Sequence, residues 1–169
     1  MPADARAIRR KSELTENINV RAMARADLHA IARVLDETGL FPAEMLAEMA
    51  EPWLAGRAPH HWLVAERERE VIGFGYCEPE RMTIGTFNLL AIAVRPELQG
   101  QGVGTAIIAA LESRLGQSGG RVLIVETSSL PDYAATRAFY DGLGFAREAR
   151  IRDFYDTGED KILFWKQIG

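Results

Sequence analysis

The chain has 169 residues, 47% of them hydrophobic, which is enough for one domain with a substantial core. The net charge of −4 excludes the overall basic field that nucleic-acid binding requires, and the single cysteine, Cys77, excludes an internal disulfide and a cysteine-based metal cluster. No apolar run approaches the roughly 20 residues of a membrane span and no signal-peptide core is present, so a cytoplasmic protein without membrane partners is expected.

The N-terminal part of the chain predicts a tail followed by a short strand and two helices. Residues 1–17 are rich in arginine and are expected to form a tail, which leaves residues 18–169 as the domain. After a strand over Ile18–Ala22, Asp27 is expected to cap a helix. A second helix is predicted from Phe41, with a buried stripe formed by Met45, Met49 and Trp53.

Two strand patterns, Trp62–Ala65 and Val71–Cys77, are separated by a charged turn and predict a hairpin. Cys77 is expected to be a small buried apolar residue and not a nucleophile. The adjacent His60 and His61 face opposite sides at a strand start, so they are not expected to chelate a metal.

The middle of the chain reads as strand, glycine-rich turn, helix and strand. The apolar run Leu89–Val94 is followed by a helical stripe of Val103, Ile107, Leu111 and Leu115. The next run, Val122–Val125, shows no alternation, as expected for a strand covered on both faces. A crossover of this kind predicts parallel pairing of the two strands.

The last part of the chain predicts a helix and a final hairpin. In the helix, Ala135, Phe139 and Leu143 are expected to form the buried stripe, with Thr136 and Tyr140 on a different face. The hairpin is predicted to pair residues 145–151 with 161–166 through a loop over Asp153–Asp160.

The glycine turn is a candidate site for a diphosphate, because a helix N-terminus offers unpartnered N–H groups and partial positive charge. The P-loop motif is excluded because no lysine follows Gly104. The dinucleotide fingerprint fits Gly100 and Gly102 but finds Thr105 in place of its third glycine. Glu126, about 20 residues further on, keeps that interpretation open.

A third pattern, Gln/Arg-x-x-Gly-x-Gly/Ala, is matched by Gln99, Gly102 and Gly104, and here the sequence resembles the GNAT superfamily of acyl-CoA-dependent N-acyltransferases. Family members also carry Val-x-Pro before the turn and aromatic-Tyr-x-x-x-Gly-Phe at the end of a later helix. Both motifs are present, as 94–96 and 139–145. Tyr133 stands where the family's helix usually opens with Asn, which puts any contact of that Asn with the cofactor in doubt.

The resemblance implies a single α/β domain, with a central twisted mixed sheet of about six to seven strands flanked by about four helices. It implies acetyl-CoA as co-substrate, no metal, and a primary amine, either on a small molecule or at a peptide N-terminus, as acceptor. A monomer or homodimer is expected. The implied cofactor-binding residues are Ile92, Ala93, Val94, Gln99, Gly100, Gln101, Gly102, Val103, Gly104, Thr105, Thr136 and Tyr140.

Tyr140 is the family's usual general acid, and Glu126 is the candidate base because Leu89–Val94 contains no ionisable group. Glu126 and the segment Asp153–Tyr155 also resemble the branch that acetylates protein N-termini. Three alternatives remain open for these residues. In the first, Glu126 forms an ion pair with an Arg or Lys and is not the base. In the second, the base acts through a water relay. In the third, Tyr140 only packs in the core and is not the acid.

Two other functions compete with an acetyltransferase. A non-catalytic acyl-CoA sensor would keep the glycine turn but would need neither Glu126 nor Tyr140, and both are present. A nicotinamide-dependent oxidoreductase would need a larger doubly wound sheet that begins at the fingerprint. Only one crossover unit is visible in the sequence, so the oxidoreductase ranks last.

Overall fold

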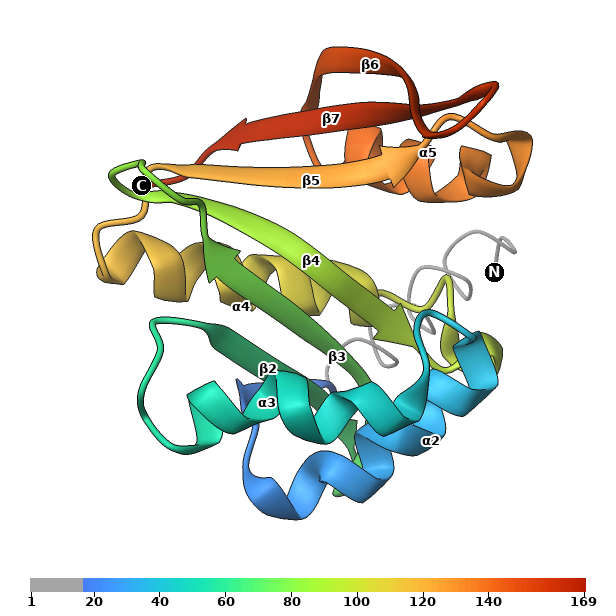
Figure 1. Ribbon diagram of the computed structural model, residues 1–169. Coiled ribbons are helices and arrows are strands. Elements are labelled where there is room, and N and C mark those ends of the chain that lie inside the picture. Colours follow the sequence, from blue (N-terminus) through green and yellow to red (C-terminus); the bar gives the residue numbers. More distant parts are fainter. Residues whose placement is uncertain (1–16) are drawn as a thin grey trace, which may run out of the picture. The chain divides into compact units, whose positions relative to one another are not determined.

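The computed structural model describes residues 17–169, so the predicted tail lies outside the described residues apart from Asn17. The described chain forms one seven-stranded mixed sheet and four α-helices, which confirms the predicted fold class. The strand order is β1-β2-β3-β4-β5-β7-β6. The elements, drawn in Figure 1, are β1 Asn19–Ala22, α2 Leu28–Thr38, α3 Leu46–Leu54, β2 His61–Arg67, β3 Glu70–Pro79, β4 Thr86–Val94, α4 Val103–Gln117, β5 Val122–Ser128, α5 Ala134–Gly142, β6 Ala146–Asp156 and β7 Glu159–Gln167, with short 3₁₀ turns η1 Arg25–Asp27, η2 Ala43–Met45, η3 Pro96–Leu98 and η4 Pro131–Tyr133.

The described residues group into two compact units. The first unit contains the chain up to Tyr76 together with Ala91–Leu111, and the second contains Cys77–Leu90 together with Glu112–Gly169. The glycine turn therefore belongs to the first unit, whereas Glu126 and Tyr140 belong to the second.

The core of the first unit lies between β2, β3 and helices α2 and α3. Trp62 stacks on Tyr76 with ring centroids 4.1 Å apart, and Phe74 is fully buried beside them. The stripe predicted over Met45, Met49 and Trp53 was correct in part, because Met49 and Trp53 pack against this core and Met45 does not. Leu46 and Ala50 are buried, whereas the Met45 side chain is 49% exposed.

Helix α4 packs closely on β3 because two residues of that strand are glycines. A Cβ at Gly73 would lie 2.7 Å from the carbonyl oxygen of Ala93, and one at Gly75 would lie 2.7 Å from Cγ2 of Ile107. Any larger residue would push away either β4 or α4. The predicted α4 stripe is confirmed, because Val103, Ile107, Leu111 and Leu115 are all buried.

Asp27 stabilises the start of α2 in a different way from the predicted cap. Its carboxylate makes no cap bond to α2 and instead accepts the backbone N–H of Ala24 at 2.8 Å. It also accepts two N–H groups of Arg21, at 2.7 and 2.9 Å. The guanidinium of Arg21 is the main cause that lowers the pKa of Asp27 below its ordinary value.

Replacing Asp27 with Asn is expected to lower the free energy of unfolding at neutral pH by about 1–3 kcal/mol, because charge-assisted bonds to a largely buried group are lost. A carboxyl group whose pKa is lower in the folded state than in the unfolded state stabilises the fold at pH values above its unfolded-state pKa. This stabilisation is lost as the pH falls through the folded-state pKa. The difference between wild type and Asp27→Asn should therefore shrink in acid. Urea unfolding at several pH values measures it, with the exposed Asp36→Asn as control. A difference that stays constant down to low pH would contradict this account.

The second unit is built around β5, which pairs with β4 in parallel and with β7 antiparallel. The parallel pairing was predicted and is confirmed. The expectation that β5 is covered on both faces was wrong, because burial alternates along the strand, with Leu123, Val125 and Thr127 buried and the residues between them partly exposed. In Figure 1 helix α5 runs alongside strands β5 and β7.

The final hairpin is longer than predicted. Strand β6 continues to Asp156 and β7 begins at Glu159, so only Thr157 and Gly158 form the turn. The predicted loop over Asp153–Asp160 was therefore wrong. The two strands lose regular register between Ile151 and Asp156, and a bulge of this kind escapes a two-residue alternation pattern.

Candidate functional site

The glycine turn connects η3 to α4 and has the backbone geometry of an anion site. Gly100 and Gly102 have φ of 73° and 87°, a region that residues with a Cβ rarely adopt. The N–H of Ala106 donates to the carbonyl of Gly102 at 2.9 Å. The N–H groups of Val103, Gly104 and Thr105 lie in the first turn before it, and such groups have no partner inside a helix. They are the fixed donors of the predicted diphosphate site.

Side chains of the turn hold it against neighbouring strands. Nε2 of Gln99 donates to the carbonyl of Val94 at 3.1 Å, which ties the turn to the end of β4. Gln101 donates to the carbonyl of Glu97 at 3.1 Å and accepts Nη1 of Arg67 at 3.2 Å. A cation from β2 thus lies at the glycine turn. The sequence pattern did not indicate this contact, because Arg67 falls in a charged stretch that is typical of a hairpin turn.

Strand β4 continues beyond the end of its ladder with β5. That ladder runs from Thr86 paired with Val122 to Leu89 paired with Val125. Residues Ile92, Ala93 and Val94 lie further along β4, in the same unit as the glycine turn. The structure brings these residues together with Gln99–Thr105 on one strand-turn-helix segment.

Glu126 forms an ion pair, the alternative that the sequence left open. Its Oε2 lies 2.8 Å from Nζ of Lys161 on β7. The Lys161 side chain is only 9% exposed and that of Glu126 is 32% exposed. The ammonium group also lies 3.5 Å from the centre of the Phe154 ring, which adds a cation–π contact.

Tyr140 is the buried residue of α5, so the predicted buried stripe of Ala135, Phe139 and Leu143 was wrong. Tyr140 is 3% exposed, whereas Ala135 is exposed and Phe139 and Leu143 are only partly buried. Its ring contacts three other rings, those of Phe139, Phe145 and Phe164. Burial raises the pKa of Tyr140 well above its ordinary value, so the hydroxyl keeps its proton at neutral pH.

Glu126 and Tyr140 lie on opposite faces of the β5–β7 pair. Val125 is paired with Phe164, and Glu126 with Leu163. Successive side chains of a strand point to opposite faces, so Glu126 points away from the face that carries Phe164. Tyr140 packs on Phe164, with ring centroids 5.3 Å apart. Thr136, partly buried, lies one helical turn before Tyr140 on α5.

The acidic residues of the β6–β7 hairpin bind within the hairpin. Asp153, at φ of 51°, accepts the N–H of Gly158 at 2.8 Å, and its own N–H donates to Asp160 at 2.9 Å. Asp160 also forms an ion pair with Arg150. These carboxylates are therefore structural, whereas two aromatic side chains of the hairpin, Phe154 and Tyr155, are 48% and 44% exposed. Burial, together with Glu126 and Glu159, raises the pKa of Tyr155.

Cys77 is buried, as predicted, and burial raises the pKa of its thiol to about 12, which makes it a poor nucleophile. The rings of His60 and His61 contact Tyr76 and Trp53, respectively. Within residues 17–169, no group of three or more His, Cys, Asp or Glu side chains is placed to hold a metal ion. None of the helices in this range is long and apolar enough to cross a membrane.

Comparison with known proteins gives one consistent family. Residues 58–147 match the acetyltransferase (GNAT) domain family. The chain is 30% identical over 112 residues to an uncharacterized N-acetyltransferase of Methanocaldococcus jannaschii, a match covering 64% of this chain and 67% of that protein. It is 33% identical over 104 residues to the L-2,4-diaminobutyric acid acetyltransferase of Nocardia farcinica, covering 59% of this chain and 52% of that protein. A solved GNAT-family structure from Desulfovibrio desulfuricans superimposes with a TM-score of 0.82 at 31% identity, covering 90% of this chain and 99% of that one.

Proposed function

Because this chain belongs to the GNAT acetyltransferase family and is an N-acetyltransferase, we propose that it moves an acetyl group from acetyl-CoA to a primary amine by direct attack in a ternary complex. One observation carries the proposal. A backbone anion site follows the end of β4, and a proton acceptor and a proton donor, Glu126 and Tyr140, lie on opposite faces of the β5–β7 pair. Acetyl transfer between two substrates requires each of these three groups.

The glycine turn fits the diphosphate of CoA. The N–H groups of Val103, Gly104 and Thr105 and the positive end of the α4 dipole favour an anion. A Cβ at Gly100 would have no heavy atom within 4 Å, so an approaching phosphate meets no obstruction there. Arg67, held by Gln101, adds a positive charge to the turn. When bound, acetyl-CoA supplies the activated acetyl group as a thioester, and CoA leaves as the thiol.

The two side chains divide the proton transfers between them. Glu126, whose Oε2 lies 2.8 Å from Nζ of Lys161, accepts a proton from the amine as the nitrogen–carbon bond forms. Tyr140 donates a proton to the sulfur as the carbon–sulfur bond breaks, and burial keeps its hydroxyl protonated until then. Backbone N–H groups of the strand Ala91–Val94 are the donors proposed to stabilise the developing oxyanion.

We propose that the acceptor amine approaches the face of the sheet that carries Glu126. Phe154 contacts Lys161 on this face, and the field of Glu126 reaches Tyr155. Exposed aromatic rings next to a carboxylate suit a cationic amine. The resemblance of Asp153–Tyr155 to the N-terminal acetyltransferase branch supports a peptide N-terminus, whereas the Nocardia relative is named for a small diamino acid.

A thiol-release assay with acetyl-CoA tests the proposed function. The acceptor panel should contain free amino acids, including L-2,4-diaminobutyrate, together with polyamines, an aminoglycoside and short peptides with free or blocked N-termini. Turnover with a free peptide and none with its blocked form supports the N-terminal acceptor. Turnover with small amines alone supports a small-molecule acceptor. An absence of turnover with every acceptor, despite CoA binding, would favour the non-catalytic sensor.

The glycine turn predicts that CoA, and not NAD, raises the melting temperature, because a ligand that binds only the native state stabilises it. Gly102→Ala is expected to remove most of this shift, since φ of 87° disfavours a residue with a Cβ. Gly116→Ala is the matched control on the same helix, where a new Cβ meets no atom closer than 3.8 Å. A shift with NAD and none with CoA would overturn the acetyltransferase proposal.

A further inference from the structure

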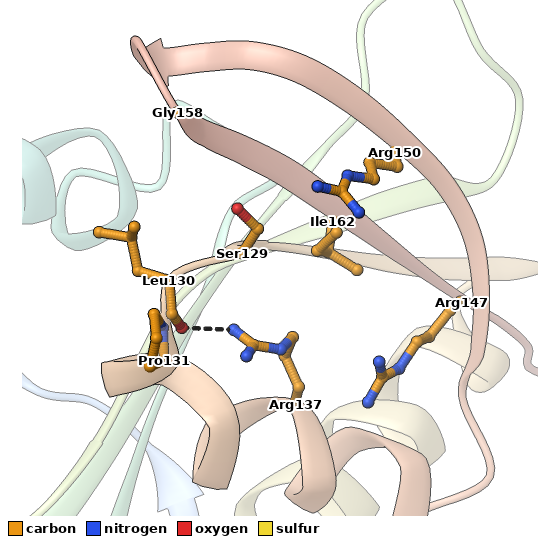
Figure 2. Close-up of a pocket in the computed structure, with 8 residues that line it drawn as sticks. All are labelled: Ser129, Leu130, Pro131, Arg137, Arg147, Arg150, Gly158 and Ile162. Atoms are coloured by element: carbon orange, nitrogen blue, oxygen red, sulfur yellow. Dashed lines mark hydrogen bonds between the residues drawn. The ribbon is translucent and has the colours of Figure 1, made fainter.

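We propose that the second unit contains a separate binding site for a small organic anion that carries a carboxylate or phosphate group. The site is a cavity of about 390 Å³, called here the arginine pocket. It lies between α5 and the β6–β7 hairpin, and Figure 2 shows the side chains of three arginines around it. Its lining residues are Ser129, Leu130, Pro131, Arg137, Arg147, Arg150, Gly158 and Ile162.

The lining contains three guanidinium groups and no acidic side chain. Arg147 and Arg150 each have a carboxylate partner outside the lining, Asp141 and Asp160 respectively. Among the described residues no carboxylate lies within 4.0 Å of the guanidinium of Arg137. The carboxylate of Asp141, which is bonded to Arg147, acts on Arg137 only over a longer distance, so the cavity has three guanidinium groups and two neighbouring carboxylates.

Arg137 is held in place by the backbone and not by a charge. Its Nη1 donates to the carbonyl oxygens of Ser128 at 2.6 Å and Leu130 at 2.9 Å. Both N–H groups of Nη1 are thereby used, so Nε and Nη2 provide the donors for a ligand. An arginine fork that is already fixed loses little conformational entropy when it binds a carboxylate or a phosphate.

The other two arginines are also positioned before any ligand binds. Arg147 makes two bonds to Asp141, at 3.0 and 2.6 Å, and its guanidinium lies 5.7 Å from the centre of the Phe164 ring. Arg150 is fixed by its ion pair with Asp160, whose other oxygen accepts the N–H of Asp153. The two side chains are 52% and 66% exposed, and each guanidinium keeps donors that its carboxylate partner does not use.

The apolar part of the lining indicates an organic anion and not a bare inorganic ion. Leu130, Pro131 and Ile162 line the same cavity, and a volume near 390 Å³ is in the range that small organic molecules occupy. A ligand with an apolar body and one anionic group would use both kinds of surface.

The arginine pocket is distinct from the proposed amine site. Ile162, which lines the pocket, is paired with Thr127, whereas Glu126 is paired with Leu163. Because side chains alternate along a strand, Ile162 and Glu126 point to opposite faces of the β5–β7 pair. The glycine turn belongs to the other unit. The pocket is therefore a second anion site in addition to the one proposed for CoA.

Calorimetric titration with four probes tests the proposal: phenyl phosphate, benzoate, inorganic phosphate and the neutral benzyl alcohol. Phenyl phosphate or benzoate should bind saturably and more tightly than benzyl alcohol, and the stronger of the two identifies the anionic group. Arg137→Gln should weaken that binding by about tenfold or more, since hydrogen bonds to a charged group are lost. Arg114→Gln, an exposed arginine on α4, removes the same charge elsewhere and should have no effect.

A second pair of variants keeps the test decisive if Arg137→Gln fails to fold. Leu130→Glu places a carboxylate at the pocket without removing either bond from Arg137, because that arginine binds the backbone carbonyl of residue 130. It should compete with the probe and weaken binding by about tenfold or more, whereas Leu130→Gln should not. Equal affinity in all variants would assign the binding to another site, such as the glycine turn, and would overturn the proposal. So would no saturable binding of either organic anion, or equally tight binding of benzyl alcohol.

Discussion

Replacing Glu126 with Gln is expected to lower kcat/KM by about 10²–10⁴, the usual contribution of general-base assistance. The loss should be greatest below the pKa of the acceptor amine, where the free amine is scarce and attack depends on a proton acceptor. The amide of Gln has nearly the same shape as the carboxylate and cannot take a proton from the amine. Measurement of kcat/KM from acid to neutral pH checks this result.

The effect of losing the ion pair with Lys161 has to be distinguished from the effect of losing the proposed proton acceptor. Glu126→Gln leaves a largely buried ammonium group without its carboxylate, and breaking such a pair is costly to stability. Lys161→Met is the matched variant, because it breaks the same pair and keeps the carboxylate. If Glu126 is the base, Lys161→Met retains most of the activity that Glu126→Gln loses. Equal losses in the two variants would show that the ion pair has a structural role only.

The strand-turn-helix segment could be predicted from the sequence because its signals are local. The apolar run of β4, the glycines at 100 and 102 and the α4 stripe all lie within a few residues of one another, and each has one dominant structural meaning. The parallel pairing of β4 with β5 follows from the chirality and length of the crossover between them. The glycine turn, the strongest part of the candidate site, rests on these signals.

Glu126 and Tyr140 could be named as candidates from the sequence, but their surroundings could not be predicted, because the contacts of these residues join distant parts of the chain. Tyr140 is buried by Phe145 and Phe164, and Phe164 belongs to a strand that begins after the whole β6–β7 turn. A stripe of residues at helical spacing from Ala135 does not show which residues of a later strand pack against the helix. The partner of Glu126 is Lys161, and the partner of Gln101 is Arg67, which a sequence pattern treats as separate solvated charges.

The length of the final hairpin was missed for a related reason. Asp153, Asp156 and Gly158 are typical turn residues, and a sequence pattern counts them as a loop. In the structure Asp153 occupies a positive-φ position within β6, and its carboxylate and N–H both form bonds across the hairpin. Strand β6 therefore passes through a bulge and continues to Asp156.

Replacing Tyr140 with Phe is expected to lower kcat while leaving the affinity for CoA and the fold intact. The three ring contacts with Phe139, Phe145 and Phe164 depend on the aromatic ring and not on the hydroxyl. The free energy of unfolding should therefore change by no more than about 1 kcal/mol. Tyr133→Phe is the matched control, because it removes the same hydroxyl from an exposed tyrosine just before α5.

The pH dependence distinguishes the role of Tyr140 from that of Glu126. Because burial raises its pKa, the hydroxyl stays protonated throughout the neutral range, and Tyr140→Phe should lower kcat by a nearly constant factor at every pH in that range. The factor should lie at or below the lower end of about 10²–10⁴, since a thiol with a pKa of about 8.5 is already a fair leaving group. Single-turnover rates measured alongside kcat exclude product release as the limiting step. If Tyr140→Phe keeps the full rate of chemistry across that range, the hydroxyl is not the acid, the sulfur leaves as a thiolate, and Tyr140 serves only to pack α5 on β7.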